Sequence, residues 1–271
     1  MTPPTETYWL RQAVDAPLFP DLIWSRPEHT AAAGKLMVIG GNAYAFAAPA
    51  QAYSEAIKTG VGTARVLLPD RLHHTVGTRL EADFAPSTSS GSFSQEAMAN
   101  LMADSAWADG VLLVGDIGRN SETALLLEKY ITAYRGQLTL TKDAADYFTA
   151  APQSLLARPE TTLVVSFAQL QKLAISAKFS HVLTFSMDLV RLVEALHEFC
   201  ERYQVNIVVK HLSTIIVASG DRVSTTKLSE DIDVWRVKTA THAAVWWLQN
   251  PTKTFEALTT AIWETTSPQQ K

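Results

Sequence analysis

The feature that most constrains the fold is the alternation of short apolar runs with longer helical patterns along most of the chain. Residues 35–39 form an apolar run that breaks into the glycine turn Gly40-Gly41, and a helical pattern over residues 49–60 follows. Residues 111–114 repeat this order and again end in glycine. Because parallel strands need a crossover connection, usually a helix, the alternation predicts an α/β protein with a mostly parallel central sheet covered by helices on both faces.

The remaining strands and helices are expected from the same two patterns, short apolar runs for strands and apolar residues at three- and four-residue spacing for helices. A turn of residues 219–222 lies between two β-patterned runs and predicts a hairpin. Ser92 and Gln95 have the spacing of a capping box, and Asn120 or Ser121 is a candidate helix cap. Further strands are expected at residues 65–68, 138–140, 163–165, 206–209, 214–218 and 223–226, and further helices at 92–106, 121–136, 187–203, 239–248 and 254–263.

The chain shows no internal repeat and no convincing linker. We therefore expect residues 1–271 to form one domain, with residues 1–30 as an N-terminal arm or short helix that leads into the core.

Composition and charge exclude several classes of protein. Hydrophobic residues make up 47% of the chain and charged residues 18%, which is typical of a globular core. The formal net charge is −4 without a long basic run, so neither nucleic acid nor an anionic membrane is an expected partner. Cys200 is the sole cysteine, which excludes an intrachain disulfide, and we expect it to act as a small apolar helix residue. Without a signal peptide or an apolar run of eighteen residues, a cytoplasmic location is expected.

Four segments together carry a resemblance to a known family. They occur in the family's order and cover most of residues 34–226. The chain resembles the ADP/ATP-dependent NAD(P)H-hydrate dehydratases, a branch of the ribokinase-like superfamily. The segments are Gly34-Lys-Leu-Met-Val-Ile-Gly-Gly-Asn42 with Tyr44 and Ala48-Pro49, Lys58-Thr-Gly-Val-Gly-Thr-Ala-Arg65, Ala108-Asp-Gly-Val-Leu-Leu-Val-Gly-Asp-Ile-Gly-Arg119, and Ile207-Val-Val-Lys210 with Thr214-Ile-Ile216.

The resemblance implies a ribokinase-like three-layer sandwich and a lyase that repairs hydrated nicotinamide cofactors. In that family ADP or ATP, with Mg²⁺ as an optional companion, phosphorylates the hydrated NAD(P)H before phosphate elimination. The turn after residues 35–39 and the loop after residues 111–114 would contact this substrate. By analogy the substrate-binding residues are Gly40, Gly41, Asn42, Gly115, Gly118 and Asp143. Asp116 replaces a family glycine and adds a negative charge where a phosphate-bearing ligand would approach.

The chain departs from the family where its chemistry resides. The family's His-Pro-Gly-Glu element corresponds to Ser166-Phe-Ala-Gln169, and only Asp143 remains of its Asp-Ala-Asp element. The Gly-x-Gly-Asp turn that binds phosphate and supplies the catalytic Asp corresponds to Lys238-Thr-Ala-Thr241. Thr241 replaces the Asp, and threonine is no general base near neutral pH without an activating partner.

Other groups near this segment are candidates to substitute for the lost ones. His242 titrates in a suitable range, although a surface or capping histidine is the simpler interpretation. Lys238 and Arg236 are candidates to hold phosphate by charge, against the simpler reading of solvated cations. The expected nucleotide- or phosphate-binding residues are Lys210, Lys238, Thr239 and Ala240. Glu230, Asp231 and Asp233 are expected to form a solvated loop, and no metal site is expected.

Three functions therefore remain open. The chain is a divergent NAD(P)H-hydrate dehydratase, an inactive protein that binds a nucleotide or nicotinamide, or a subunit of a homo-oligomer. Trp246, Trp247 and Trp263 motivate the last alternative, although a core position for the first two is favoured. Exposed positions are expected for His73 and His74, whereas His211 is expected to fill space near a nucleotide.

Overall fold

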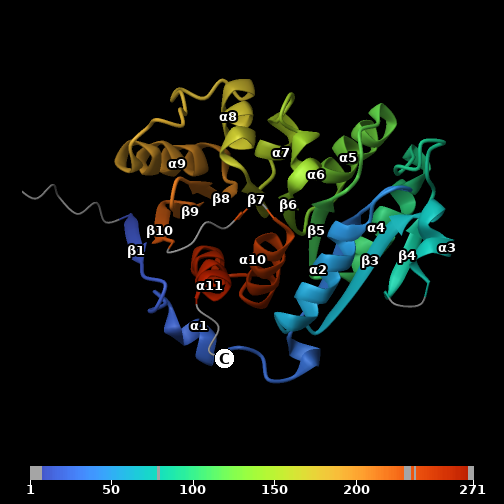
Figure 1. Ribbon diagram of the computed structural model, residues 1–271, viewed down its shortest axis with the longest axis horizontal. Coiled ribbons are helices and arrows are strands. Elements are labelled where there is room, and N and C mark those ends of the chain that lie inside the picture. Colours follow the sequence, from blue (N-terminus) through green and yellow to red (C-terminus); the bar gives the residue numbers. More distant parts are fainter. Residues whose placement is uncertain (1–7, 78–79, 229–232, 235, 268–271) are drawn as a thin grey trace, which may run out of the picture.

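The computed structural model describes residues 8–77, 80–228, 233–234 and 236–267, and these form one ten-stranded sheet with helices on both faces (Figure 1). The strand order is β1-β10-β9-β8-β7-β6-β5-β2-β3-β4, and within it β9 is antiparallel to both of its neighbours while all other pairs are parallel. The strands are β1 (Trp9–Gln12), β2 (Lys35–Gly40), β3 (Thr63–Pro69), β4 (Ala82–Ala85), β5 (Gly110–Gly115), β6 (Gln137–Thr141), β7 (Thr161–Val165), β8 (Asn206–His211), β9 (Thr214–Ser219) and β10 (Arg222–Lys227).

Two helical layers enclose this sheet. One layer holds α4 (Met98–Trp107), α5 (Ser121–Ala133), α8 (Phe167–Ser176) and α9 (Leu189–Tyr203), with the short α6 (Lys142–Asp146) and α7 (Gln153–Leu156). The other holds α2 (Ala47–Lys58), α10 (Val237–Gln249) and α11 (Thr254–Thr266), with α1 (Pro20–Trp24) beside α11. Figure 1 shows α5 to α9 on one side of the sheet and α2, α10 and α11 on the other. The short α3 (His73–Val76) follows β3.

Successive residues of the central strands point into opposite layers. In β5, Val111 and Leu113 belong to the core beneath α5, whereas Leu112 and Val114 belong to the core beneath α10. All four are at most 1% exposed. Such double burial explains why these strands are continuous apolar runs rather than alternating ones.

Most predicted elements are confirmed, and the differences have local causes. Ser92 and Gln95 form no capping box, because the Ser92 hydroxyl donates to the carbonyl of Ile117 and the helix begins only at Met98. Asn120 does cap α5, accepting from the N–H groups of residues 122 and 123.

The N-terminal segment differs from a simple arm. Residues 9–12 form β1, which pairs in parallel with β10 at the edge of the sheet. The Gln12 side chain donates to the Thr226 hydroxyl at 3.1 Å and to the carbonyl of Thr259 at 3.0 Å. No described helix is long and apolar enough to cross a membrane.

Candidate functional site

The carboxyl ends of β2, β5 and β6 lie side by side and bring the predicted substrate-binding residues together. The N–H of Gly41 donates to the carbonyl of Gly115 at 3.0 Å, so the two glycine turns touch. The Asn42 side chain donates to the carbonyl of Asp116 at 2.5 Å. Gly40, Gly41, Asn42, Gly115, Gly118 and Asp143 therefore form one connected region. Their contact with a substrate stays a prediction.

The two strand-end glycines are required by close packing. A Cβ on Gly40 would lie 2.5 Å from the carbonyl oxygen of Gly115, and one on Gly115 would lie 2.4 Å from Oδ1 of Asp143. Gly115 also has a φ of 103°, which L side chains rarely adopt. These glycines are explained by the assembly of the loops themselves, with or without a ligand.

Asp143 binds backbone donors of the loop after β5. Its Oδ1 accepts from the N–H of Asp116 at 2.8 Å, and its Oδ2 accepts from Ile117 at 3.0 Å and from Gly118 at 3.3 Å. Successive N–H groups of this kind make an anion-binding concavity. Here the anion is the protein's own carboxylate.

Asp116 is the second carboxylate of this region, and it lies at the start of α2. Its Oδ2 accepts from the N–H of Ala48 at 2.7 Å, and its Oδ1 pairs with the ammonium of Lys142 at 2.9 Å. From the sequence, we expected Asp116 to add an unfavourable negative charge near a ligand. Its pairing with Lys142 was not foreseen, because Lys142 belongs to another loop.

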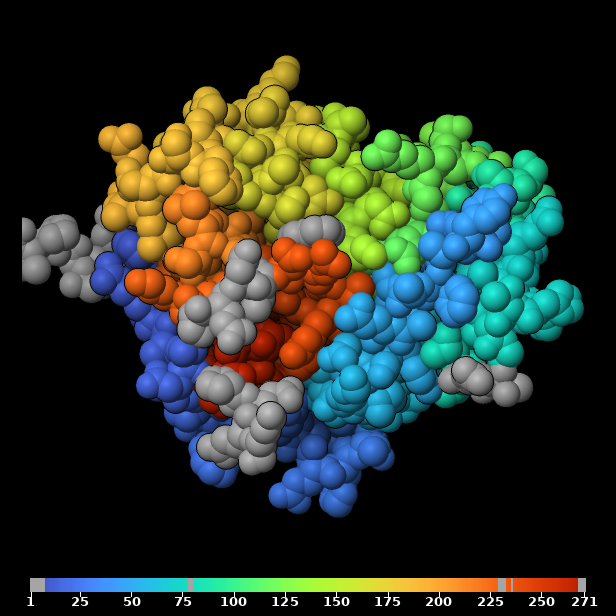
Figure 2. Space-filling model, in the orientation of Figure 1, coloured from blue at the N-terminus to red at the C-terminus, as the bar shows by residue number. Residues whose placement is uncertain are grey.

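The predicted phosphate-binding segment forms the first turn of α10. Near the other end of this helix, Leu248 packs against Gly34 and Gly110, at the amino ends of β2 and β5. The helix therefore runs opposite to these strands and places residues 237–241 at the carboxyl edge. Figure 2 shows the orange-red surface of α10 between the blue surface of α2 and a yellow-green surface above it.

Thr241 faces the interior and has no contact with solvent. It is 0% exposed, and its hydroxyl donates to the carbonyl of Val237, 2.8 Å away, within the same helix. Thr239 and Ala240 are also buried, and Lys238 is half-buried. Among the residues that the structure describes, Lys238 has no carboxylate partner, whereas Arg236 pairs with Asp233 at 2.9 Å.

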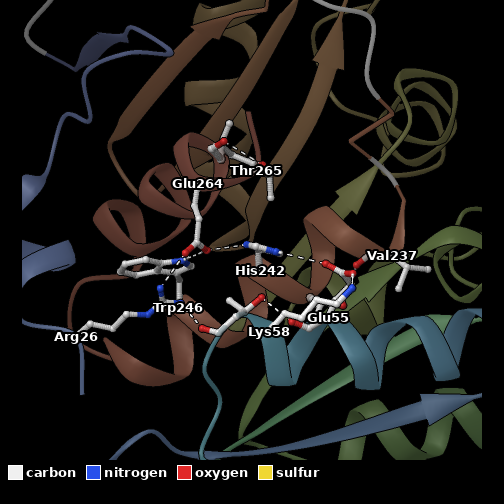
Figure 3. Close-up of polar contacts among 11 residues, drawn as sticks. Arg26, Glu55, Lys58, Val237, His242, Trp246, Glu264 and Thr265 are labelled. Atoms are coloured by element: carbon white, nitrogen blue, oxygen red, sulfur yellow. Dashed lines mark hydrogen bonds and ion pairs between the residues drawn. The ribbon is translucent and has the colours of Figure 1, made fainter. Parts of the chain in front are cut away.

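His242 points away from this edge toward α11 and α2 (Figure 3). It is 7% exposed, so the surface interpretation is wrong. Its Nδ1 lies 2.7 Å from Oε2 of Glu264, and its Nε2 lies 3.8 Å from Oε2 of Glu55. Trp246 Nε1 donates to the same Oε2 of Glu264 at 2.8 Å, while Arg26 Nη1 pairs with Oε1 at 2.8 Å.

The environment of Glu264 stabilises its charged form. Burial by itself would raise the pKa of this carboxyl, but hydrogen bonds from His242 and Trp246 and the charge of Arg26 lower the pKa to about 2. His242 is thereby committed to a structural contact. Sequence reasoning missed Glu264, Arg26 and Glu55, because no local pattern connects them.

Residues 166–169, which the resemblance aligns with the family's His-Pro-Gly-Glu element, lie at the start of α8. The Ser166 hydroxyl accepts from the N–H of Gln169, and the Gln169 side chain accepts from the N–H of Ser166, which is a capping box. The Gln169 amide also donates to the carbonyl of Lys142 at 2.8 Å. These polar side chains thus have structural partners.

The last two residues of β8, Lys210 and His211, face opposite sides of the sheet. His211 is 2% exposed, contacts the rings of Phe167 and Phe185, and lies with Nε2 2.9 Å from the carbonyl of Phe185. Lys210 follows the alternation of Val208 and therefore faces the layer of α10 and α11.

The other singled-out residues belong to the core or the surface. Trp246 and Trp247 are each 1% exposed, so they present no surface to another subunit. Cys200 is fully buried, as expected. His73 and His74 are exposed, also as expected. Glu230, Asp231 and Trp235 lie outside the described residues. Within the described part of the chain, no group of acidic, His and Cys side chains is arranged to hold a metal.

Comparison with solved structures identifies the fold as ribokinase-like. A ribokinase-like superfamily protein from Enterococcus faecalis superposes with a TM-score of 0.73 at 16% identity, covering 96% of this chain and 87% of that one. A protein from Streptococcus mutans gives 0.68 at 15% identity, covering 91% and 86%. The ADP/ATP-dependent NAD(P)H-hydrate dehydratase from Bacillus subtilis, co-crystallised with ATP and Mg²⁺, gives 0.61 at 12% identity, covering 92% and 87%.

The sequence comparisons add no closer assignment. No family model matches the chain, and no curated protein matches it. The shared feature is therefore the fold, whose similar structures include kinases and an NAD(P)H-hydrate dehydratase.

Proposed function

We propose that this protein binds a nucleotide, ADP or ATP, at the carboxyl edge of its sheet and lacks the acid–base step of the NAD(P)H-hydrate dehydratases. The observation that carries the proposal is the state of Thr241. Its hydroxyl is buried and bonded within α10, so it has neither the charge nor the access that proton transfer from a substrate needs. His242 offers no replacement, because Nδ1 is bonded to Glu264 on the other side of the helix.

Phosphate binding is supported by the first turn of α10. The helix has thirteen residues, no side-chain cap at Arg236 and no acidic residue in its first turn. The N–H groups of such a turn and the helix dipole favour an anion. Lys238 lies in the same turn, half-buried, and Lys210 faces the same layer.

Mg²⁺ would accompany the nucleotide rather than occupy a protein cage. The carboxylates of Asp116 and Asp143 are committed to backbone N–H groups and Lys142. Mg²⁺ bound mainly through substrate phosphates and water suits a site of this composition.

Calorimetric titration of the full chain with ADP, ATP, AMP and NADH, with and without Mg²⁺, tests the proposal. We expect binding of ADP or ATP. Lys238→Ala should lose about tenfold or more in affinity, because a charge-assisted hydrogen bond contributes about 1.5–3 kcal/mol. The exposed Lys172 on α8 gives the matched control Lys172→Ala, which should bind as the wild type does. Failure of both ADP and ATP to bind, with or without Mg²⁺, would refute the proposal.

A second candidate function is the repair reaction itself. The intact contact between the turns of Gly41 and Gly115, where the family's substrate is expected, favours it. Incubation of NADH-hydrate with ADP or ATP, followed by NADH absorbance, separates the two. We expect no recovery above the uncatalysed rate, and recovery would establish catalysis without the usual Asp.

A further inference from the structure

We infer that Asp116 is an internal anion that closes the start of α2 to phosphate and so sets the charge of the ligand group accepted beside Gly41 and Asn42. The inference concerns specificity, and its application to a nucleotide rests on the proposed function. The helix concerned is α2, whose first turn contains no acidic residue.

The start of α2 is completed from a different part of the chain. Phe46 at the N-cap offers no side-chain cap, and the first turn contains no acidic residue. The unsatisfied N–H groups and the dipole of a helix start attract an anion. Asp116, which follows β5, supplies it by accepting from the N–H of Ala48 at 2.7 Å.

Asp116 is held in a conformation that glycine would adopt more easily. Its φ is 56°, and the neighbouring Lys142 has a φ of 53°. Such backbone persists where the surroundings over-determine it. Four contacts do so. The Asp116 carboxylate accepts from the Ala48 N–H and pairs with the Lys142 ammonium at 2.9 Å. The Asp116 carbonyl accepts from the Asn42 amide at 2.5 Å, and the Asp116 N–H donates to Asp143 at 2.8 Å.

A second carboxylate fills the other backbone anion hole of the same half of the edge. Asp143 binds the N–H groups of residues 116–118. A phosphate approaching either group of donors would meet a carboxylate already in place, and two like charges at contact distance repel each other. The ammonium of Lys142 is already paired with Asp116.

The two halves of the edge therefore differ in charge preference. The start of α10, with Lys238, is suited to phosphate, whereas the part beside Asp116 is suited to an uncharged or cationic group. The ligand class that fits both is a nucleotide whose anionic groups lie at one end and whose other end is an uncharged ring or a hydroxyl-bearing sugar. A ligand with phosphates at both ends is excluded.

Amide NMR with inorganic phosphate as the probe, at constant ionic strength, tests the closure directly. In the wild type, phosphate should leave the Ala48 amide resonance unchanged. Asp116→Gly suits the positive φ and frees both Ala48 and Lys142. We expect phosphate to shift the Ala48 amide in this variant, with an affinity there about tenfold or more above the wild type.

Two further variants keep the test decisive. Asp116→Asn retains the side-chain shape without the charge, so it should show a smaller gain and replaces the glycine variant if that one does not fold. Asp188→Asn removes a carboxylate that caps α9, in the opposite helical layer, and should gain nothing at Ala48. A wild-type Ala48 shift with phosphate, or no shift in the folded Asp116 variants, overturns the inference. Failure of ADP and ATP to bind the wild type contradicts the proposed function alone.

Discussion

The Nδ1 atom of His242 lies 2.7 Å from Oε2 of Glu264, and this contact joins α10 to α11. The same carboxylate binds Trp246 of α10 and Arg26 of the N-terminal segment. Glu55 of α2 faces the other ring nitrogen at 3.8 Å. Glu264 thus connects the consecutive helices α10 and α11 to the N-terminal segment, which is distant in sequence, and His242 brings in α2 as well.

Removal of the Glu264 charge should destabilise the protein. Glu264→Gln leaves His242 and Arg26 with weaker acceptors in a largely buried place, and we expect a loss of about 1–3 kcal/mol in the free energy of unfolding. Urea unfolding measures it. The control is Glu198→Gln, because Glu198 pairs with His181 at 2.8 Å on the exposed surface and should contribute less than about 1 kcal/mol. Equal effects of the two substitutions would contradict this account.

The same carboxyl should give the wild type a distinct acid sensitivity. Its pKa falls from 4.5 to about 2 on folding, so its contribution is complete above the unfolded value and is lost as pH falls from about 4.5 toward 2. The stability difference between wild type and Glu264→Gln should therefore shrink across this interval. Unfolding free energies of both proteins from about pH 6 to pH 3 test the sign, and a difference that grows on acidification would be inconsistent with it.

Thr241→Asp places a carboxylate at the position that the resemblance aligns with the family's catalytic Asp, and we expect that it does not create a catalyst. The side chain would bury a charge at a position that is 0% exposed, with an expected loss of about 2–4 kcal/mol in unfolding free energy. Thr132 on α5 makes the same hydroxyl contact to a carbonyl four residues earlier, at 2.8 Å, but is exposed. Thr132→Asp places its charge in solvent near the C-terminal end of α5, beside Glu128, and should cost about 1 kcal/mol or less. A stable Thr241→Asp variant that repairs NADH-hydrate would show that the position is accessible.

The carboxylate of Asp143 should be needed to order the loop after β5. Asn at this position has one acceptor oxygen in place of two, so one or two of the three N–H groups lose their partner, at about 1–3 kcal/mol. Amide hydrogen exchange at residues 116–118 should accelerate in Asp143→Asn. Asp146→Asn on the same helix keeps an acceptor oxygen for its one side-chain contact, from the Gln169 amide, and should leave the amides of residues 116–118 protected.

Several elements follow from local chemistry and were predicted from the sequence. Strand β5 is an apolar run followed by glycine, the helix α9 has apolar residues at three- and four-residue spacing, and Asn120 caps α5 as expected. Parallel order follows as well, because strands that alternate with helices must return in the same direction. The placement of Gly40, Gly115 and Asp143 at one edge required only that carboxyl ends of neighbouring parallel strands meet.

What the tertiary structure decided depends on partners far apart in the chain. Ser92 has a capping-box sequence, but it donates to Ile117 in another loop. The four residues of β1 have no strong strand pattern, and they form a strand because their backbone pairs with β10.

The charged residues of the site also divide into those that the sequence predicted and those whose partners only the fold decided. The sequence by itself predicted, through the resemblance, that Lys238-Thr-Ala-Thr241 stands where the family has its Gly-x-Gly-Asp turn, and it showed that Asp116 adds a charge. Only the fold decided that Asp116 pairs with Lys142 and caps α2, and that His242 turns to Glu264. The physical reason is that such pairs form between side chains that become neighbours when whole helices and strands pack together. No local periodicity of the sequence predicts which side chains will be neighbours.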